Sequence, residues 1–191
     1  MKGVFVFLAE GFEETEAIAT WDVLRRGGIE ATMVSITESR MVTGAHGLPV
    51  EAAMTRSEFE DAVCLEGTTA EDAMVFPGGM PGTRNLAADE ALMSMMIRHY
   101  EEGGTVAAIC AAPGYVVSQL PSLEGKVFTC FDGCEAATVA KGAEYVKVPA
   151  VTDGNLITGR GPGCAVEFGL QIVSHIMGEE VGARVRSGLM L

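Results

Sequence analysis

Histidine and positively charged residues are scarce in this sequence. The 191 residues include 3 His and 13 Lys and Arg against 26 Asp and Glu, which gives a formal net charge of −13 at pH 7. Such an excess of negative charge argues against a surface that binds nucleic acid or an anionic membrane. Because histidines are so few, a zinc site has little support, and we expect neither a metal nor an organic cofactor.

Long apolar runs and a secretory leader are also lacking. No apolar segment is long enough to span a bilayer, and no signal peptide precedes Val4. The cysteines are odd in number and include no Cys-x-x-Cys pair, which predicts reduced thiols in a soluble, cytoplasmic protein. The spacing of Cys130 and Cys134 would permit metal ligation, but this is the less favoured interpretation. The five cysteines are Cys64, Cys110, Cys130, Cys134 and Cys164.

What the sequence does have is a core-forming composition. Hydrophobic residues make up 48% of it, which argues against disorder, and its length suits one domain over residues 1–191. Apolar runs alternate with helical patterns, which predicts an α/β fold with a mostly parallel sheet and helices on both faces. Strands are expected at 3–8, 30–36, 73–76, 105–109 and 126–130, with a hairpin at 41–50 and either a hairpin or two strands at 145–158. Helices are expected at 13–26, in segments up to 102, after residue 110, at 161–177 and at 179–187.

One stretch, residues 105–114, combines a buried strand with a candidate reactive residue. The strand ends at Ile109 and small residues that begin a helix follow, so Cys110 lies on a strand-to-helix turn. Free N–H groups and the helix dipole at such a turn favour a thiolate over a thiol. The arrangement parallels the nucleophile elbow of other α/β enzymes. The alternative is that Cys110 is a small buried apolar residue, the usual environment of a free cysteine.

Three further loops are expected at the same edge of the sheet, where ligands of such folds bind. Glu16, in the loop and helix start at 11–16, lies beside inward-facing positions, and burial would favour its neutral, hydrogen-bond-donating form. Gly78 and Gly79 permit close approach of backbone N–H groups, which together with the amide of Ala111 form a candidate oxyanion hole. An ordinary tight turn is the alternative for the two glycines.

The fourth loop, residues 160–163, leaves two interpretations of Arg160 open. Arg160 belongs either to the cap of the last long helix or to an anion site. No histidine has an obvious role as a base, since His99 and His175 lie on predicted helices. His46 lies in a hairpin and would reach a site only through tertiary or dimer contacts. The sequence therefore gives no evidence for a Cys–His protease triad.

Five motifs in order along nearly the whole chain are similar to one family. They are GFEETE at 11–16, DVLRR at 22–26, FPGG at 76–79, AICA at 108–111 and RGPG at 160–163. Together they resemble the ThiJ/PfpI superfamily, in particular the glyoxalase III-like branch of the Parkinson-disease-associated protein deglycase. The resemblance implies a flavodoxin-like, doubly wound fold, usually in a homodimer. It also implies a reactive Cys110 with Glu16 as its carboxyl partner, and backbone donors at Gly78, Gly79 and Ala111.

Two positions depart from the family pattern. Some members have a histidine after the short strand that follows the elbow, where this sequence has Cys130. Members of the protease-like branch have a histidine directly after the nucleophile, where this sequence has Ala111, so we do not expect peptidase activity. Cys130 is a candidate resolving cysteine that forms a disulfide with oxidised Cys110. The alternative is that Cys130 fills apolar space.

The activities reported for the family define two hypotheses of different classes. The first is an enzyme of glyoxalase or deglycase type that acts on small dicarbonyls or their early adducts. The second is a non-enzymatic sensor of oxidative stress, or a chaperone, that works through oxidation of Cys110. An apolar first helix and a glycine-rich hairpin favour a twofold homodimer, in which His46 and Arg26 would approach the partner's Cys110.

Overall fold

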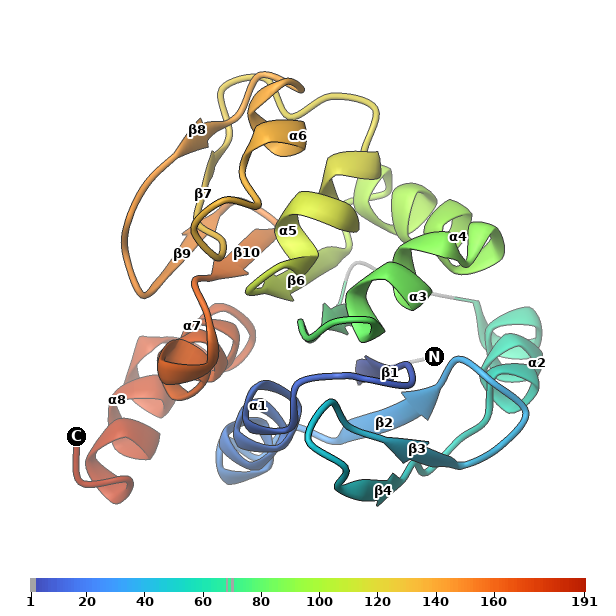
Figure 1. The fold of residues 1–191 in the computed structure, drawn as a ribbon. Coiled ribbons are helices and arrows are strands. Elements are labelled where there is room, and N and C mark those ends of the chain that lie inside the picture. Colours follow the sequence, from blue (N-terminus) through green and yellow to red (C-terminus); the bar gives the residue numbers. More distant parts are fainter. Residues whose placement is uncertain (1–2, 68, 70) are drawn as a thin grey trace.

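A twisted six-stranded sheet forms the centre of the protein (Figure 1). The computed structural model describes residues 3–67, 69 and 71–191. The strand order is β2-β1-β5-β6-β10-β9, and all neighbours are parallel except the antiparallel pair β9–β10. This confirms the predicted mostly parallel α/β sheet. The strands are β1 (Val4–Leu8), β2 (Ala31–Ser35), β5 (Ala73–Phe76), β6 (Thr105–Ile109), β9 (Ala150–Asp153) and β10 (Leu156–Gly159).

Helices cover both faces of the sheet because its inner strands are apolar on both sides. In β1, Val4, Val6 and Leu8 face one core, whereas Phe5 and Phe7 face the other. The first core is closed by α1 (Glu14–Arg26), α7 (Ala165–Met177) and α8 (Glu179–Gly188). The second is closed by α2 (Arg56–Glu66), α3 (Gly82–Ala88), α4 (Glu90–Glu101), α5 (Ala112–Tyr115) and the 3₁₀ turn η1 (Val117–Gln119).

Helix α1 begins and ends as its sequence predicts, and its start positions a candidate site residue. The carboxylate of Glu13 is the N-cap and accepts a hydrogen bond from the N–H of Glu16 at 2.7 Å. Arg25 and Arg26 lie in the last turn, where cations interact favourably with the helix dipole, and Gly27 follows. The cap therefore places Glu16 in the first turn, at the carboxyl edge of the sheet.

The four predicted loops lie side by side along one edge. They follow β1, β5, β6 and β10, which are consecutive neighbours in the sheet. Strand β1 is second from one side of the sheet, and β5 and β6 are central. The β9–β10 hairpin forms as predicted and adds β10 to β6. The edge therefore gathers segments from the beginning, middle and end of the chain.

Three local features differ from the prediction. Helix α2 was not predicted, although Thr55 and Glu58 at its start form a capping box. Helix α5 spans only four residues, so the helix after Cys110 is much shorter than a typical one. Tyr145 lies in a separate two-stranded ladder of β7 (Val127–Phe128) and β8 (Glu144–Tyr145) rather than in the last hairpin. The remaining elements are β3 (Met41–Thr43), β4 (Pro49–Glu51), α6 (Ala136–Val139) and η2 (Pro162–Cys164).

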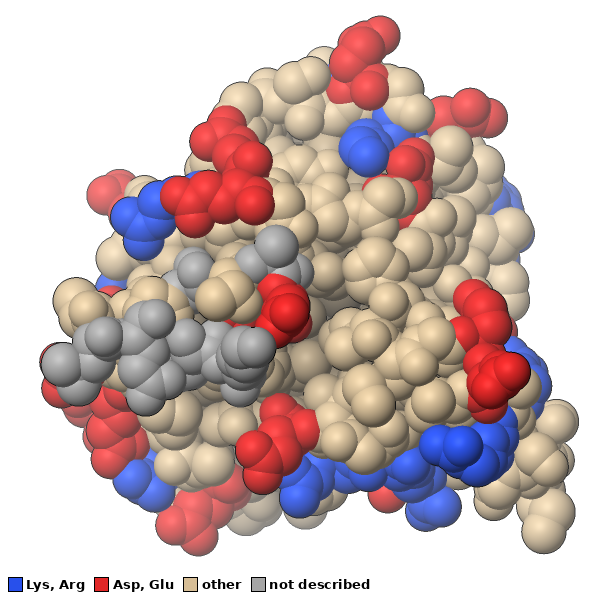
Figure 2. All heavy atoms as spheres, turned by 180° about the vertical axis from the view of Figure 1, so that it is seen from behind, with Lys and Arg blue, Asp and Glu red and all other residues tan. Residues whose placement is uncertain are grey.

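The helices and the charged side chains describe the outside of the protein. No helix in the described ranges has the length and apolar character needed to cross a bilayer. On the face drawn in Figure 2, acidic side chains are spread widely and basic ones gather along the lower edge. The organisation of residues 1–191 as a single domain stays a prediction, and its residues 1–2, 68 and 70 lie outside the described part of the chain.

Candidate active site

The backbone of Cys110 adopts a conformation that is rare for a residue with a side chain. Its φ is +66°, in the left-handed region. The N–H of Cys110 donates to the carbonyl of Gly159 at 2.9 Å, and the carbonyl of Cys110 accepts from the N–H of Phe131 at 2.8 Å. Both hydrogen bonds stabilise the sharp turn between β6 and α5 that the sequence predicts. Strain of this kind persists where the surroundings fix it, commonly at functional sites.

Glu16 reaches the same place from α1. Its side chain is fully buried, and its Oε2 accepts a hydrogen bond from the N–H of Gly78 at 2.8 Å. A Cβ built on Gly78 would lie 2.6 Å from Glu16 Oε2, 2.6 Å from Cys110 Cβ and 3.0 Å from Cys110 Sγ. The carboxyl and the thiol therefore converge on the space that the missing side chain of Gly78 leaves open.

Burial and proximity change the proton affinities of both groups. Burial raises the pKa of Glu16 from 4.5 to about 7, although hydrogen bonds from Cys110 and Gly78 act in the opposite direction. Burial, followed by the charge of the Glu16 carboxylate, raises the pKa of the Cys110 thiol. The expected preference for a thiolate from the helix start alone is thus wrong, because α5 is a single short turn and the thiol is buried beside the Glu16 carboxyl. The two groups titrate as a pair.

The distribution of backbone donors corrects one part of the predicted oxyanion hole. The N–H of Gly78 donates to Glu16, so it is not free to bind a substrate oxygen. The N–H groups of Ala111 and Gly79 are directed at the Cys110 sulfur and lower the pKa of its thiol. Gly79 has a φ of +91°, and a Cβ there would lie 2.4 Å from the N of Glu13. Only glycine fits this close approach. Because the N–H of Gly78 is already bound to Glu16, Ala111 and Gly79 are the candidate donors to a substrate oxygen.

This geometry agrees with a comparison against protein families. The model of the DJ-1/PfpI family matches residues 2–175, which include every element that contributes to the site. The chain belongs to the DJ-1/PfpI family. The resemblance to the ThiJ/PfpI superfamily in the sequence is thereby confirmed.

This DJ-1/PfpI member is similar to proteins of animals and plants. It is 33% identical to protein dj-1beta of Drosophila melanogaster over 100% of this chain and 97% of that protein. It is equally similar, at 33%, to protein DJ-1 homolog A of Arabidopsis thaliana, but this chain spans only 47% of that relative's length. It is 29% identical to the glutathione-independent glyoxalase DJR-1.2 of Caenorhabditis elegans, over 90% of this chain and 86% of that protein.

Solved structures confirm the flavodoxin-like fold of this DJ-1/PfpI member. The crystal structure of Drosophila melanogaster DJ-1beta superposes with a TM-score of 0.87 at 32% identity, covering 100% of this chain and 98% of that one. A DJ-1 superfamily protein from Salmonella typhimurium gives a TM-score of 0.85 at 34% identity, with the same coverage of both chains.

Two candidate accessory residues of this DJ-1/PfpI member pair with carboxylates of α1 rather than with Cys110. Arg26 pairs with Asp22 at 2.6 Å in the last turn of α1. Since a helix rises 1.5 Å per residue, Arg26 is about 15 Å along the helix axis from Glu16. His46 is exposed, and its Nδ1 lies 2.7 Å from the carboxylate of Glu14. A role for either residue therefore depends on a partner subunit.

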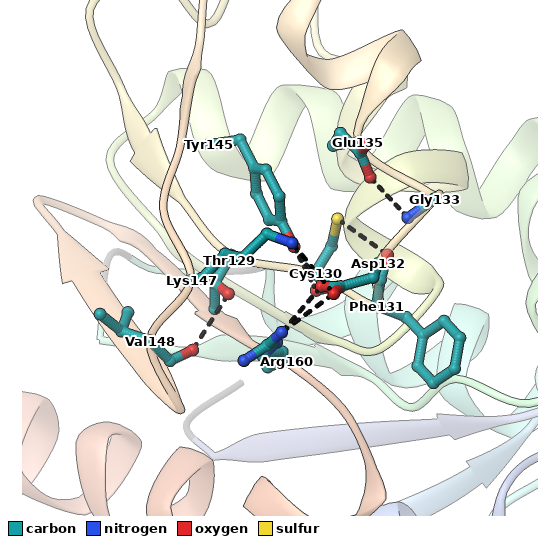
Figure 3. A network of polar contacts seen from close by, with 10 residues as sticks. All are labelled: Thr129, Cys130, Phe131, Asp132, Gly133, Glu135, Tyr145, Lys147, Val148 and Arg160. Carbon is teal, nitrogen blue, oxygen red and sulfur yellow. Dashed lines mark hydrogen bonds and ion pairs between the residues drawn. The ribbon is translucent and has the colours of Figure 1, made fainter.

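Cys130 is buried in the core on the other face of the sheet from Cys110. Cys110 belongs to the core closed by α1 and α7, whereas Cys130 packs in the core that contains Phe128. Its Sγ is 3.4 Å from the carbonyl oxygen of Phe131 (Figure 3). This placement favours the apolar-filling interpretation of Cys130 over the resolving one.

Arg160 does bind an anion, but that anion belongs to the chain itself. Its Nη2 donates to both carboxylate oxygens of Asp132, at 3.0 Å each (Figure 3). The same carboxylate accepts from the hydroxyl of Tyr145 at 2.6 Å and from Nζ of Lys147 at 3.1 Å. Neither Asp132 nor Phe131 was predicted as a site residue, because no local pattern connects them to the loop at 160–163.

One group of described side chains has the spacing needed to hold a metal ion. Ligand atoms of Glu13, Glu14 and His46 all lie within 4.8 Å of one another. Both carboxylates already have structural roles: Glu13 caps α1, and Glu14 accepts from the N–H of His46 at 2.6 Å. These contacts are sufficient to explain the cluster, which joins the start of α1 to the β3–β4 hairpin.

Proposed function

We propose that this protein is a cysteine-dependent glyoxalase or deglycase that acts on small dicarbonyls or their early adducts. The observation that supports the proposal is the buried Glu16 carboxyl, with a pKa of about 7, beside the thiol of Cys110. A group that titrates near neutrality can both donate and accept a proton during one reaction. The similarity to a glutathione-independent glyoxalase favours the same chemistry.

The first step is addition of sulfur to the aldehyde. With the shared proton on Glu16, the thiolate of Cys110 attacks the aldehyde carbon of a compound such as methylglyoxal and forms a C–S bond. The N–H groups of Ala111 and Gly79 stabilise the resulting oxyanion. This oxyanion takes the proton from Glu16, which leaves a neutral hemithioacetal and a Glu16 carboxylate.

The second stage moves hydrogen between two carbons. The Glu16 carboxylate removes the proton from the former aldehyde carbon, which gives an enediolate, and returns it to the neighbouring carbon. The hydroxyl proton of the former aldehyde moves to the oxygen of that neighbouring carbon, which becomes the 2-hydroxyl group. The product is a thioester of a 2-hydroxy acid. Water then attacks the thioester, Glu16 accepts a proton from that water, and the C–S bond breaks. This step releases the 2-hydroxy acid and restores the starting pair, and the net reaction consumes one water.

Formation of D-lactate from methylglyoxal tests the proposal. We expect turnover by the wild type and its loss in Cys110→Ala and in Glu16→Ala. Cys64→Ala is the matched control, since Cys64 is an exposed cysteine on α2. Equal rates in the wild type, Cys110→Ala and Glu16→Ala would contradict the proposal.

The same pair of residues supports a second candidate function, oxidation sensing. Peroxide converts a thiolate to a sulfenic and then a sulfinic acid, and a protonated Glu16 could donate a hydrogen bond to the sulfinate. The amides of Ala111 and Gly79 are placed to bind its oxygens. Intact mass after mild peroxide, with and without Cys110, separates the two functions. Rapid, selective gain of two oxygens without dicarbonyl turnover would favour the sensor.

We also propose that the protein is a homodimer. The outer side of α1 carries two apolar residues, Ile18 and Ala19, that are only partly buried. Together with Thr15 and Asp22 they line a shallow hollow in the surface. Such a surface on the helix that carries Glu16 is suited to a twofold contact. Sedimentation at micromolar concentration tests this, and a monomer there would contradict it.

A further inference from the structure

The two residues that form hydrogen bonds with the backbone of Cys110 each directly precede a member of one ion pair. Gly159, which accepts from the N–H of Cys110, is followed by Arg160. Phe131, which donates to the carbonyl of Cys110, is followed by Asp132. Since Arg160 and Asp132 bind each other, the contacts close a ring that begins and ends at Cys110. We call Gly159, Arg160, Asp132 and Phe131 the Cys110 clamp.

The carboxylate of Asp132 is held by three side chains, those of Tyr145, Lys147 and Arg160 (Figure 3). Hydrogen bonds from Tyr145, Lys147 and Arg160 hold the pKa of Asp132 well below its usual range, so its carboxylate is charged at neutral pH. Its contact with Arg160 uses both carboxylate oxygens, which restricts the geometry of the pair as well as its distance.

The strip of chain that contains Phe131 runs along the end of β10 and is attached at two points. Upstream, the N–H of Thr129 donates to the buried hydroxyl of Thr158 at 2.9 Å. Downstream, Asp132 binds Arg160. The N–H that Phe131 offers to Cys110 lies between these attachments, so the ion pair determines how firmly that N–H is placed.

An ion pair this exposed has little effect on stability. The side chains of Arg160 and Asp132 are 37% and 49% exposed, and pairs in such positions contribute little to the free energy of folding. Their position beside the strained peptide of Cys110 suggests a different use. A left-handed cysteine relaxes unless its neighbours prevent it, and relaxation would turn the sulfur away from Glu16 and from the amides of Ala111 and Gly79.

We propose that the Asp132–Arg160 pair is a positioning device for the nucleophile. It ties the two backbone partners of Cys110 together and so keeps the thiol directed at Glu16 and the two amides. The proposal rests on the proposed role of Cys110 as a nucleophile. Asp132 and Arg160 are positioning residues, because their effect passes through the peptide of Cys110.

A double-mutant cycle on dicarbonyl turnover tests the clamp. We expect Asp132→Asn and Arg160→Gln each to lower kcat about 10-fold, because small misplacements of a reacting group are costly, while KM stays close to that of the wild type. The double variant should be no slower than either single variant, since all three break the same pair. Arg160→Lys, which keeps the charge but loses the two-oxygen geometry, should be intermediate.

The control is an ion pair of similar exposure that includes no residue of the site or of the Cys110 clamp. Arg40 and Glu58 lie 2.5 Å apart with side chains 46% and 44% exposed, so Arg40→Gln should leave kcat unchanged. Thermal unfolding of every variant separates positioning from loss of fold. Wild-type kcat in both single variants would overturn the proposal. The proposal would also be overturned if the losses of kcat in the two single variants multiply in the double variant, or if they are proportional to the fall in melting temperature.

A second measurement keeps the clamp testable even if the proposed enzyme activity fails. The rate at which iodoacetamide alkylates Cys110 depends on the thiolate and needs no dicarbonyl chemistry. We expect the midpoint of its pH profile to shift in Asp132→Asn and in Arg160→Gln, and by the same amount in the double variant. If the alkylation profiles of the variants coincide with that of the wild type, the positioning role of the Asp132–Arg160 pair is wrong. If the wild type does not turn over dicarbonyls but the profiles shift, only the proposed enzyme activity is wrong.

Discussion

Replacing Gly78 by alanine fills the space in which Glu16 and Cys110 meet. The new Cβ would lie 2.6 Å from both Cys110 Cβ and Glu16 Oε2. Non-bonded heavy atoms pack at roughly 3.5–4.0 Å, so at least one of the two side chains must move by about 1 Å. The φ of Gly78 is outside the left-handed region, so the effect of the alanine is steric and does not come from backbone strain.

Both the reaction rate and the stability should respond to this displacement. A reacting group misplaced by about 1 Å reduces the rate about 100-fold. Overpacking of a filled interior lowers the free energy of unfolding by about 1–3 kcal/mol. The loss of rate should therefore exceed what partial unfolding explains, because a protein destabilised by this amount stays folded at room temperature if its stability is typical.

Three assays on Gly78→Ala and one control variant decide the matter. They are D-lactate formation from methylglyoxal, alkylation of Cys110 by iodoacetamide, and thermal unfolding. Gly188→Ala is the control, since Gly188 is exposed at the end of α8 with no atom within 4 Å of its added Cβ. Wild-type turnover and alkylation in Gly78→Ala would refute the reasoning, because the carboxyl and thiol would then not need the space above Gly78.

Three further predictions concern protonation, helix capping and oxidation. The folded protein raises the pKa of Glu16 from 4.5 to about 7, so the wild type loses stability as the pH rises through this interval. The free energy of unfolding of Glu16→Gln minus that of the wild type, measured with urea, should therefore rise by about 3 kcal/mol from about pH 4.5 to pH 8. A difference that does not change with pH would contradict this. Thr55→Ala removes the N-cap of α2, whose hydroxyl accepts from the N–H of Glu58, and should cost about 1 kcal/mol in thermal unfolding; an unchanged melting temperature would refute it. After two equivalents of peroxide, peptide mapping should find sulfinate on Cys110 and a free thiol on Cys130, whereas a disulfide between them would show that Cys130 is a resolving cysteine.

Local patterns were sufficient for most of the fold. The fully apolar run of Val4–Leu8 predicted a strand buried on both faces, and β1 is buried throughout. The charges at the two ends of α1 and the glycines after it predicted its bounds to within a residue. Helix α2 was missed even though its capping box, Thr55 with Glu58, is a sequence signal of a helix start.

The sequence by itself determined which residues could form the site, and the tertiary structure decided what each can do there. The loops with Glu16, Gly78 and Cys110 were predicted to meet because parallel strands end at a common edge. Periodicity carries no information on side-chain direction across that edge. The choice of Glu16 as the acceptor for the N–H of Gly78, and the raised pKa of the carboxyl, follow from distances and burial that only the packed sheet creates.

Arg160 illustrates the same limit. Its place after β10 was evident from the sequence, but its partner Asp132 lies 28 residues away on a loop without regular structure. Contacts of this range form when β10 adds to the sheet beside β6 and brings the two loops together. Local propensity acts over a few residues, whereas an ion pair depends on where the whole chain has folded, so this contact could be decided only in three dimensions.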